Sequence, residues 1–186
     1  MDALADGELV SRLRSGDVRA FDLAYNRYHQ RLFGFMLRMV HRRDVAEDLS
    51  QEAWSRLARG ARELRDGDRL APWLFRVARN LACSRERRLS VERDAATLIT
   101  ELELERSPKD PHESAVSAAL MRDLELGLAA LPPRDRELIL LVGVESLRPQ
   151  EAAEVLGISP EALRKRLERA REKLRAAMAK LGSEES

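Results

Sequence analysis

A tight group of polar side chains marks the helix-forming stretch "SQEAWSRL", residues 50–57. At about 100° per residue, Asp48, Gln51, Glu52 and Ser55 fall within an arc of roughly 100°, on the side away from the apolar residues. Two carboxylates this close together would suit acid–base catalysis or a metal, but no histidine, nucleophile or further carboxylate joins them. The sequence therefore predicts no catalytic and no metal site here. Helical geometry alone favours a solvated face, and it does not decide whether the cluster binds a partner.

The C-terminal part of the chain has the pattern of a helix-turn-helix. Two helical stretches, 150–156 and 162–178, are joined by "GIS". Gly157 stands where a sharp turn needs a positive φ, and Ser159 is expected to cap the second helix. Polar side chains in the N-terminal half of that helix face away from its apolar seam, where such motifs contact base edges. These candidates are Arg164, Lys165, Glu168 and Arg169. A basic, solvated helix that closes a small bundle is the alternative, but the agreement of turn, cap and basic face favours DNA binding.

Local charge also points to nucleic acid, although the net charge is only +1. Five arginines accompany one glutamate between Arg76 and Arg88, and seven basic residues accompany two glutamates between Arg164 and Arg175. The segment 89–114, in contrast, carries seven acids and three bases. Any affinity for nucleic acid must therefore come from the two basic stretches and not from the chain as a whole.

The elements that position these side chains are predicted to be helical. Apolar residues from Phe21 to Met39 are spaced three and four apart, which indicates one long helix. The acidic cluster lies on a second helix that is expected to begin with Asp44 as its N-cap and to end near Gly60. A third amphipathic helix runs from Trp73 onward, and a short helix near residues 7–15 completes an antiparallel bundle.

A change of composition separates this bundle from the rest of the chain. Residues 90–114 contain "SPKDPHES", which predicts an exposed linker, and residues 95–104 within it have a weak helical pattern. After it, residues 115–130 and 134–145 are predicted helices separated by "PPRD". The predicted fold is all-α, with two small helical domains joined by a flexible linker and a helix-turn-helix in the second. The expected boundaries are 1–89, 90–114 and 115–181, followed by a tail of 182–186.

Composition narrows the class of protein further. Charged residues make up 35% of the chain and aromatic residues 4%, which is typical of helical proteins. A single cysteine, Cys83, excludes an intramolecular disulfide, and the three histidines are too far apart in sequence for metal-ligand spacing. The longest apolar stretch, 138–144, is too short to cross a bilayer, and the N-terminus has no signal-peptide pattern. We therefore expect a cytoplasmic protein with no cofactor and no membrane insertion.

Several motifs in order resemble the extracytoplasmic-function (ECF) group of bacterial sigma factors. They are "AFDLAYNRYHQRLFGFMLRMV", "AEDLSQEAW", "PWLFRVARNLA", "LPPRDRELILL" and "AEVLGIS". The similarity covers nearly the whole chain except residues 89–114. It implies a protein without an active site of its own, which binds RNA polymerase core and directs promoter-specific transcription initiation. It also implies a dedicated anti-sigma factor that occludes the polymerase-binding faces.

The resemblance assigns a role to each candidate site residue. The helix with "AEDLSQEAW" would dock on a coiled coil of the largest catalytic polymerase subunit, through Asp48, Gln51 and Glu52. The first domain would capture the minus-ten promoter element as a single strand, in a pocket formed by residues 62–70 and a basic groove beside it. Its contacts would be Leu64, Arg65, Arg76, Arg79 and Asn80. The second domain would read the double-stranded minus-thirty-five element through Arg164, Lys165, Glu168 and Arg169.

Two other functions fit parts of the sequence. One is a helix-turn-helix regulator that acts without polymerase docking, whose first domain only dimerises. It would bind palindromic operators without polymerase. The other is a sigma mimic that titrates an anti-sigma factor without reading DNA, which would not need the two basic surfaces that this sequence has.

Overall fold

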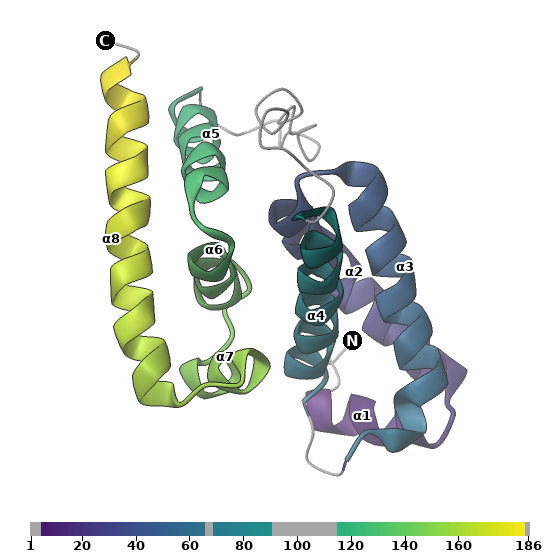
Figure 1. Ribbon diagram of the computed structural model, residues 1–186. Coiled ribbons are helices and arrows are strands. Elements are labelled where there is room, and N and C mark those ends of the chain that lie inside the picture. Colours follow the sequence, from purple (N-terminus) through teal and green to yellow (C-terminus); the bar gives the residue numbers. More distant parts are fainter. Residues whose placement is uncertain (1–4, 66–68, 91–114, 185–186) are drawn as a thin grey trace.

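The computed structural model describes residues 5–65, 69–90 and 115–184, and every regular element in these ranges is helical (Figure 1). The first domain contains α1 (Asp6–Arg14), α2 (Val18–Val40), α3 (Arg43–Gly60), the 3₁₀ turn η1 (Ala61–Glu63) and α4 (Leu70–Ser90). The second contains α5 (Ala115–Ala130), α6 (Pro133–Ile139), the π-helical segment η2 (Leu140–Val144), α7 (Pro149–Leu156) and α8 (Pro160–Glu184). The all-α prediction is confirmed. The weak helix expected at residues 95–104 lies outside the described residues.

The core of the first domain is built on the apolar stripe of α2, which packs against α3 and α4. Tyr28, Leu32 and Phe35 are buried on this stripe, and the ring of Phe35 meets that of Phe75 from α4 edge-on at 5.5 Å. Burial of these large apolar side chains is the main force that holds the three helices together. The long helix predicted from residue spacing is thus confirmed.

The start of α3 differs from the prediction. Its N-cap is Arg42 and not Asp44, which lies inside the first turn. There the carboxylate of Asp44 accepts hydrogen bonds from the guanidinium of Arg42 at 3.2 and 2.5 Å. An acid in the first turn interacts favourably with the positive end of the helix dipole, so Asp44 stabilises the helix start without capping it. Further along, Val45, Ala53 and Leu57 are buried, as the spacing predicted.

Residues 134–145 do not form one regular α-helix, contrary to the prediction. After α6 the chain widens into η2, where the backbone N–H of Glu145 donates to the carbonyl of Leu140 at 2.8 Å. The next residue, Ser146, has a positive φ of 54° and ends the helix. In a π-helical turn each N–H bonds to the carbonyl five residues earlier, and in an α-helical turn to the carbonyl four residues earlier. The spacing of apolar residues over a single turn cannot distinguish the two. The widened turn places the Glu145 carboxylate against Arg31 of α2.

The helix-turn-helix is formed as predicted by α7 and α8. Gly157 adopts the left-handed conformation (φ 66°) that the turn requires. The Ser159 side chain accepts a hydrogen bond from the backbone N–H of Ala162 at 3.1 Å, which caps α8. Leu163 and Leu167 of α8 are buried against the rest of the domain.

The two domains lie against each other, with α4 facing α7 and α2 close to α6 (Figure 1). Among the described residues, four ion pairs cross the interface, and each joins an arginine of the first domain to a glutamate of the second. In every pair the glutamate is the more buried partner. They are Arg31–Glu145 (3.1 Å), Arg38–Glu125 (2.5 Å), Arg69–Glu151 (2.7 Å) and Arg79–Glu137 (2.8 Å). The domains therefore meet through complementary charge as well as through apolar packing.

One buried guanidinium ties the helix ends of both domains together. Arg136 is 6% exposed and donates to backbone carbonyls at the C-terminal ends of α5 and α2. Its acceptors are Leu128 (2.9 Å), Ala129 (2.8 Å) and Leu131 (2.9 Å) in the second domain, and Arg38 (3.3 Å) and Met39 (3.4 Å) in the first. The last carbonyls of a helix have no partners within the helix and carry partial negative charge. Arg136 satisfies them at two helices at once.

Candidate nucleic-acid and protein interfaces

The outer face of α3 carries the predicted acidic cluster, but its charge is less concentrated than the sequence indicates. Asp48 and Gln51 are exposed, and neither has an ion-pair or hydrogen-bond partner among the described residues. Glu52 is held by Arg56 at 2.8 Å and Arg59 at 3.5 Å on the same helix. The hydrogen bond from Arg56 lowers the pKa of Glu52. Asp48 is therefore the uncompensated acid of this face.

An exposed aromatic ring on α2 packs against α3, which sequence reasoning missed. The spacing from Phe21 to Met39 also places Tyr25 on the apolar stripe of α2, but Tyr25 is 42% exposed. Its ring lies 4.9 Å from that of Trp54 on α3 and stacks on His29 at 4.8 Å. The position of Tyr25 at the edge of the stripe was the available signal, because tyrosine often lies where a buried face meets solvent. Exposed aromatic rings are enriched at protein interfaces.

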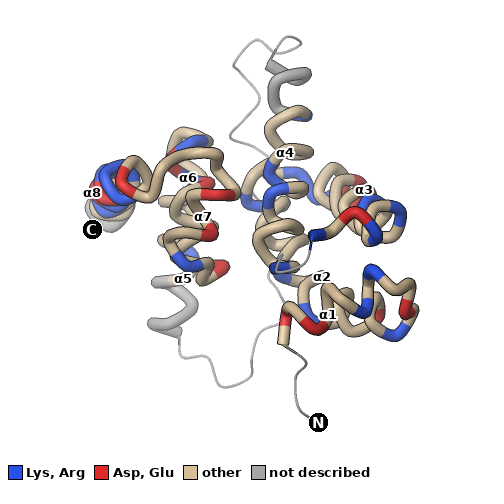
Figure 2. Tube along the Cα trace, turned by 90° about the horizontal axis from the view of Figure 1, so that it is seen from below, with Lys and Arg blue, Asp and Glu red and all other residues tan. Residues whose placement is uncertain are grey.

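The outer face of α8 carries the residues predicted to read double-stranded DNA. Arg164, Glu168 and Arg169 are exposed, with no ion-pair partner among the described residues. Lys165 is exposed too but forms a 2.8 Å ion pair with Glu161 one turn earlier. Figure 2, which looks almost along the axis of α8, shows lysine and arginine residues around this helix with acids between them. The helix thus presents an accessible, mainly basic face.

The residues predicted to contact the minus-ten strand do not form one surface. Arg65, Arg76 and Asn80 are exposed. Leu64, however, is 3% exposed and belongs to the hydrophobic core, so in this arrangement its side chain is not accessible to DNA. The backbone of Leu64 is extended directly after η1, and this conformation places its apolar side chain in the core. Arg79 faces the second domain instead of solvent.

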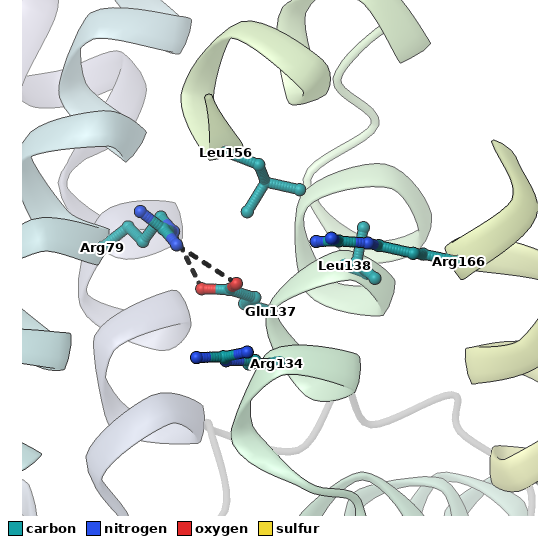
Figure 3. Close-up of a pocket in the computed structure, with 6 residues that line it drawn as sticks. All are labelled: Arg79, Arg134, Glu137, Leu138, Leu156 and Arg166. Carbon is teal, nitrogen blue, oxygen red and sulfur yellow. Dashed lines mark hydrogen bonds and ion pairs between the residues drawn. The ribbon is translucent and has the colours of Figure 1, made fainter. Parts of the chain in front are cut away.

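Arg79 is held by a fork of two hydrogen bonds to Glu137 of α6. Its Nε donates to Oε2 at 2.8 Å and its Nη2 donates to Oε1 at 3.3 Å (Figure 3). Burial opposes the charge on Arg79, but the hydrogen bond and attraction from Glu137 outweigh it and raise the pKa of Arg79. Both members of the pair are needed, because an unpaired charge at this depth is costly. No sequence signal pointed to Glu137, because the contact joins residues 58 positions apart.

Burial and hydrogen bonding also act on the other acids at the interface. Burial raises the pKa of Glu145, against the attraction of Arg31. Burial would raise the pKa of Glu151 as well, but hydrogen bonds from Arg148 and Arg69 lower it. The cross-domain carboxylates therefore differ in how firmly their charge is held.

Metal-ligand groups and membrane-spanning helices are two further features that the described residues can be checked for. No group of three or more histidine, cysteine and acidic residues in these ranges could hold a metal ion. Within the same ranges, no helix is long and apolar enough to cross a membrane.

Comparison with known proteins agrees with this architecture. Residues 24–91 match the family model of sigma-70 region 2, and residues 121–174 match that of sigma-70 region 4. The chain is 34% identical over 173 residues to RNA polymerase sigma factor CarQ of Myxococcus xanthus. The matched residues cover 92% of this chain and 97% of CarQ. It is 31% identical over 181 residues to the RNA polymerase sigma-H factor of Pseudomonas aeruginosa, and the matched residues cover 93% of each chain.

A solved structure shares the fold. The sigma factor RpoE of Bartonella quintana, crystallised in complex with the anti-sigma factor NepR, superimposes with a TM-score of 0.72 at 24% identity. The match covers 87% of this chain and 98% of RpoE.

Two helical domains, a capped helix-turn-helix and the exposed basic face of α8 are features of a DNA-binding transcription protein. The two family matches, in this order along the chain, and the similarity over almost the full length of CarQ narrow the class further. The chain belongs to the ECF group of RNA polymerase sigma factors, which bind RNA polymerase core and direct transcription initiation at promoters.

Proposed function

We propose that the outer face of α3 is the surface by which this sigma factor docks on RNA polymerase core. Asp48 and Gln51 carry this proposal, because they are exposed and have no partner among the described residues. Glu52 contributes less than the sequence indicates, since Arg56 and Arg59 already compensate its charge. The contact would be made with a basic helical surface, where charges at the rim set orientation and association rate.

The second part of the proposal concerns DNA. The exposed face of α8 would enter the major groove of the minus-thirty-five element, with Arg164 and Arg169 as base or phosphate contacts and Lys165 and Glu168 beside them. Arg65, Arg76 and Asn80 would contact the single-stranded minus-ten element. Arg79 can join them only after its pair with Glu137 is broken, so full promoter contact would remove at least this contact between the domains.

The proposal includes a regulatory partner and a place of action. An anti-sigma factor would compete with polymerase for the α3 face. RpoE, which shares the fold, was crystallised in complex with an anti-sigma factor. The chain itself would carry out no chemistry, because polymerase supplies the active site for RNA synthesis. We place its action in the cytoplasm, where polymerase and promoter DNA are found.

Copurification with polymerase core tests the docking surface. Asp48→Arg is expected to abolish capture of core polymerase, because it reverses the uncompensated charge of the face while leaving the α3 core untouched. Glu63→Arg is the matched control, since Glu63 is also an exposed acid of the first domain but lies beyond α3. Capture of core by Asp48→Arg at the level of the unmodified chain would remove the docking surface from α3.

Promoter binding tests the α8 face separately. Arg164→Ala and Arg169→Ala are each expected to weaken binding to a minus-thirty-five element by about 1–3 kcal/mol if the arginine contacts a base. Unchanged affinity in both variants would place the DNA-reading surface elsewhere.

A further inference from the structure

A cavity of about 160 Å³ lies between the two domains, where α4 faces α6, α7 and α8 (Figure 3). Its lining consists of Arg79, Arg134, Glu137, Leu138, Leu156 and Arg166. Three guanidinium groups and one carboxylate therefore surround a space that has room for a tetrahedral anion and several waters. Neither the polymerase-docking face nor the α8 residues proposed to contact DNA account for this arrangement.

The positive charge around the cavity is only partly compensated. Both carboxylate oxygens of Glu137 accept hydrogen bonds from Arg79. Arg134 and Arg166 have no ion-pair or hydrogen-bond partner in the part of the chain that the structure describes. Their side chains extend toward the same space from α6 and α8 (Figure 3). Two uncompensated positive charges beside a partly enclosed space favour an anion over any neutral or cationic ligand.

We propose that this cavity binds the phosphate group of a small phosphorylated molecule, with Arg134 and Arg166 as the principal ligands. The planar, five-donor guanidinium matches phosphate oxygens in two-bonded geometry, and such charged hydrogen bonds are stronger than neutral ones. Arg79 stays paired with Glu137, so these two residues form a neutral polar part of the opposite wall. Leu138 and Leu156 form the apolar part of the lining, which reduces screening by water.

The position of the cavity gives the ligand a consequence for the whole protein. Its phosphate contacts come from the second domain, and the opposite wall is formed by α4 of the first. A molecule that binds more tightly when these walls face each other stabilises the closed arrangement by mass action. Since Arg79 and α8 are also proposed to contact promoter DNA, the ligand would oppose DNA binding. Only this competition rests on the proposed function, because the binding itself needs neither DNA nor polymerase.

Calorimetric titration of the full chain with inorganic pyrophosphate, in phosphate-free buffer at constant ionic strength, tests the site. Saturable binding with one molecule per chain is expected. Arg134→Gln and Arg166→Gln should each weaken it about tenfold or more, as the loss of a charged hydrogen bond predicts. The matched control is Arg171→Gln, which removes an exposed arginine of α8 outside the cavity lining and should leave the affinity unchanged. Circular dichroism spectra would confirm that each variant is folded.

Three results would overturn the proposal. The first is the absence of saturable binding, and the second is equal weakening by Arg171→Gln, which would indicate a diffuse ionic effect. The third uses a short DNA duplex as a second ligand. If the duplex binds only when Arg134 and Arg166 are present, and pyrophosphate does not bind, the phosphate that the cavity recognises belongs to nucleic acid. None of these results affects the polymerase-docking assay, so failure here leaves the proposed function intact.

Discussion

Replacing Arg136 with methionine tests whether one guanidinium holds the ends of two helices together. Methionine keeps most of the length and volume of the side chain but has no donor for the surrounding carbonyls. The three bonds within the second domain are short, at 2.8–2.9 Å, whereas the two to the first domain are 3.3 and 3.4 Å and therefore weaker. Most of the effect should thus appear in the stability of the second domain.

The size of the effect follows from these bonds. A hydrogen bond to a charged group contributes about 1.5–3 kcal/mol, but bonds made by one group are not additive, and removing the guanidinium also removes its desolvation penalty. We expect Arg136→Met to lower the free energy of unfolding by about 3 kcal/mol. Arg136→Lys should lose about half as much, because its compact ammonium keeps the charge but cannot reach carbonyls on several sides. With a urea m-value of about 2 kcal/mol per molar, the midpoint of Arg136→Met falls by roughly 1.5 M.

Urea denaturation followed by two probes measures this effect and locates it. Circular dichroism reports both helical domains, whereas fluorescence reports the first, because both tryptophans, Trp54 and Trp73, belong to it. The matched control is Arg134→Met, an exposed arginine two positions away on the same helix, which should change stability by less than about 0.5 kcal/mol. A loss below about 1 kcal/mol for Arg136→Met, or equal losses for both variants, would refute the reasoning.

The Arg38–Glu125 pair, which is neither fully exposed nor fully buried, should give a coupling energy of about 1–2 kcal/mol in a double-mutant cycle with Arg38→Met and Glu125→Gln. A coupling energy near zero would show that the domains do not meet there in solution. Burial, with a smaller effect from Arg136, lowers the pKa of His41 from 6.5 to about 4, so the unfolded chain takes up a proton there before the native chain does. Stability should therefore fall by about 2 kcal/mol, after allowance for partial exposure, as the pH drops from 7 to 4, and His41→Asn should remove that part of the loss. An unchanged pH dependence in His41→Asn would contradict this assignment. Gly157→Ala should cost about 1 kcal/mol from the positive φ alone, because nothing lies within 4 Å of the added Cβ. An unchanged melting temperature in Gly157→Ala would show that the turn relaxes to another conformation.

Much of the fold was predictable because local sequence determines it. The apolar stripe of α2 requires a helix whichever partner it meets, and Gly157 followed by Ser159 specifies a tight turn and a cap through local backbone chemistry. The start of α3 was misjudged because an acid near a helix N-terminus is favourable both at the cap and in the first turn. The widened turn η2 was missed because its apolar residues are spaced as in an α-helix.

The candidate sites were predictable only in part. The exposure of Asp48 and of Arg164 follows from helical geometry, since each lies opposite a buried face. The pairing of Arg79 with Glu137 and the burial of Leu64 depend on how segments distant in sequence pack. Glutamates of the second domain gave no signal of their own, because surface acids are common on helices of any function.

Transcription initiation in a reconstituted system tests the central claim most directly. Purified chain is combined with core polymerase and a library of DNA fragments, and the 5′ ends of the transcripts are sequenced with and without the chain. The account predicts new start sites that share two upstream elements at constant spacing, and their loss with Asp48→Arg. Transcripts identical with and without the chain would contradict it.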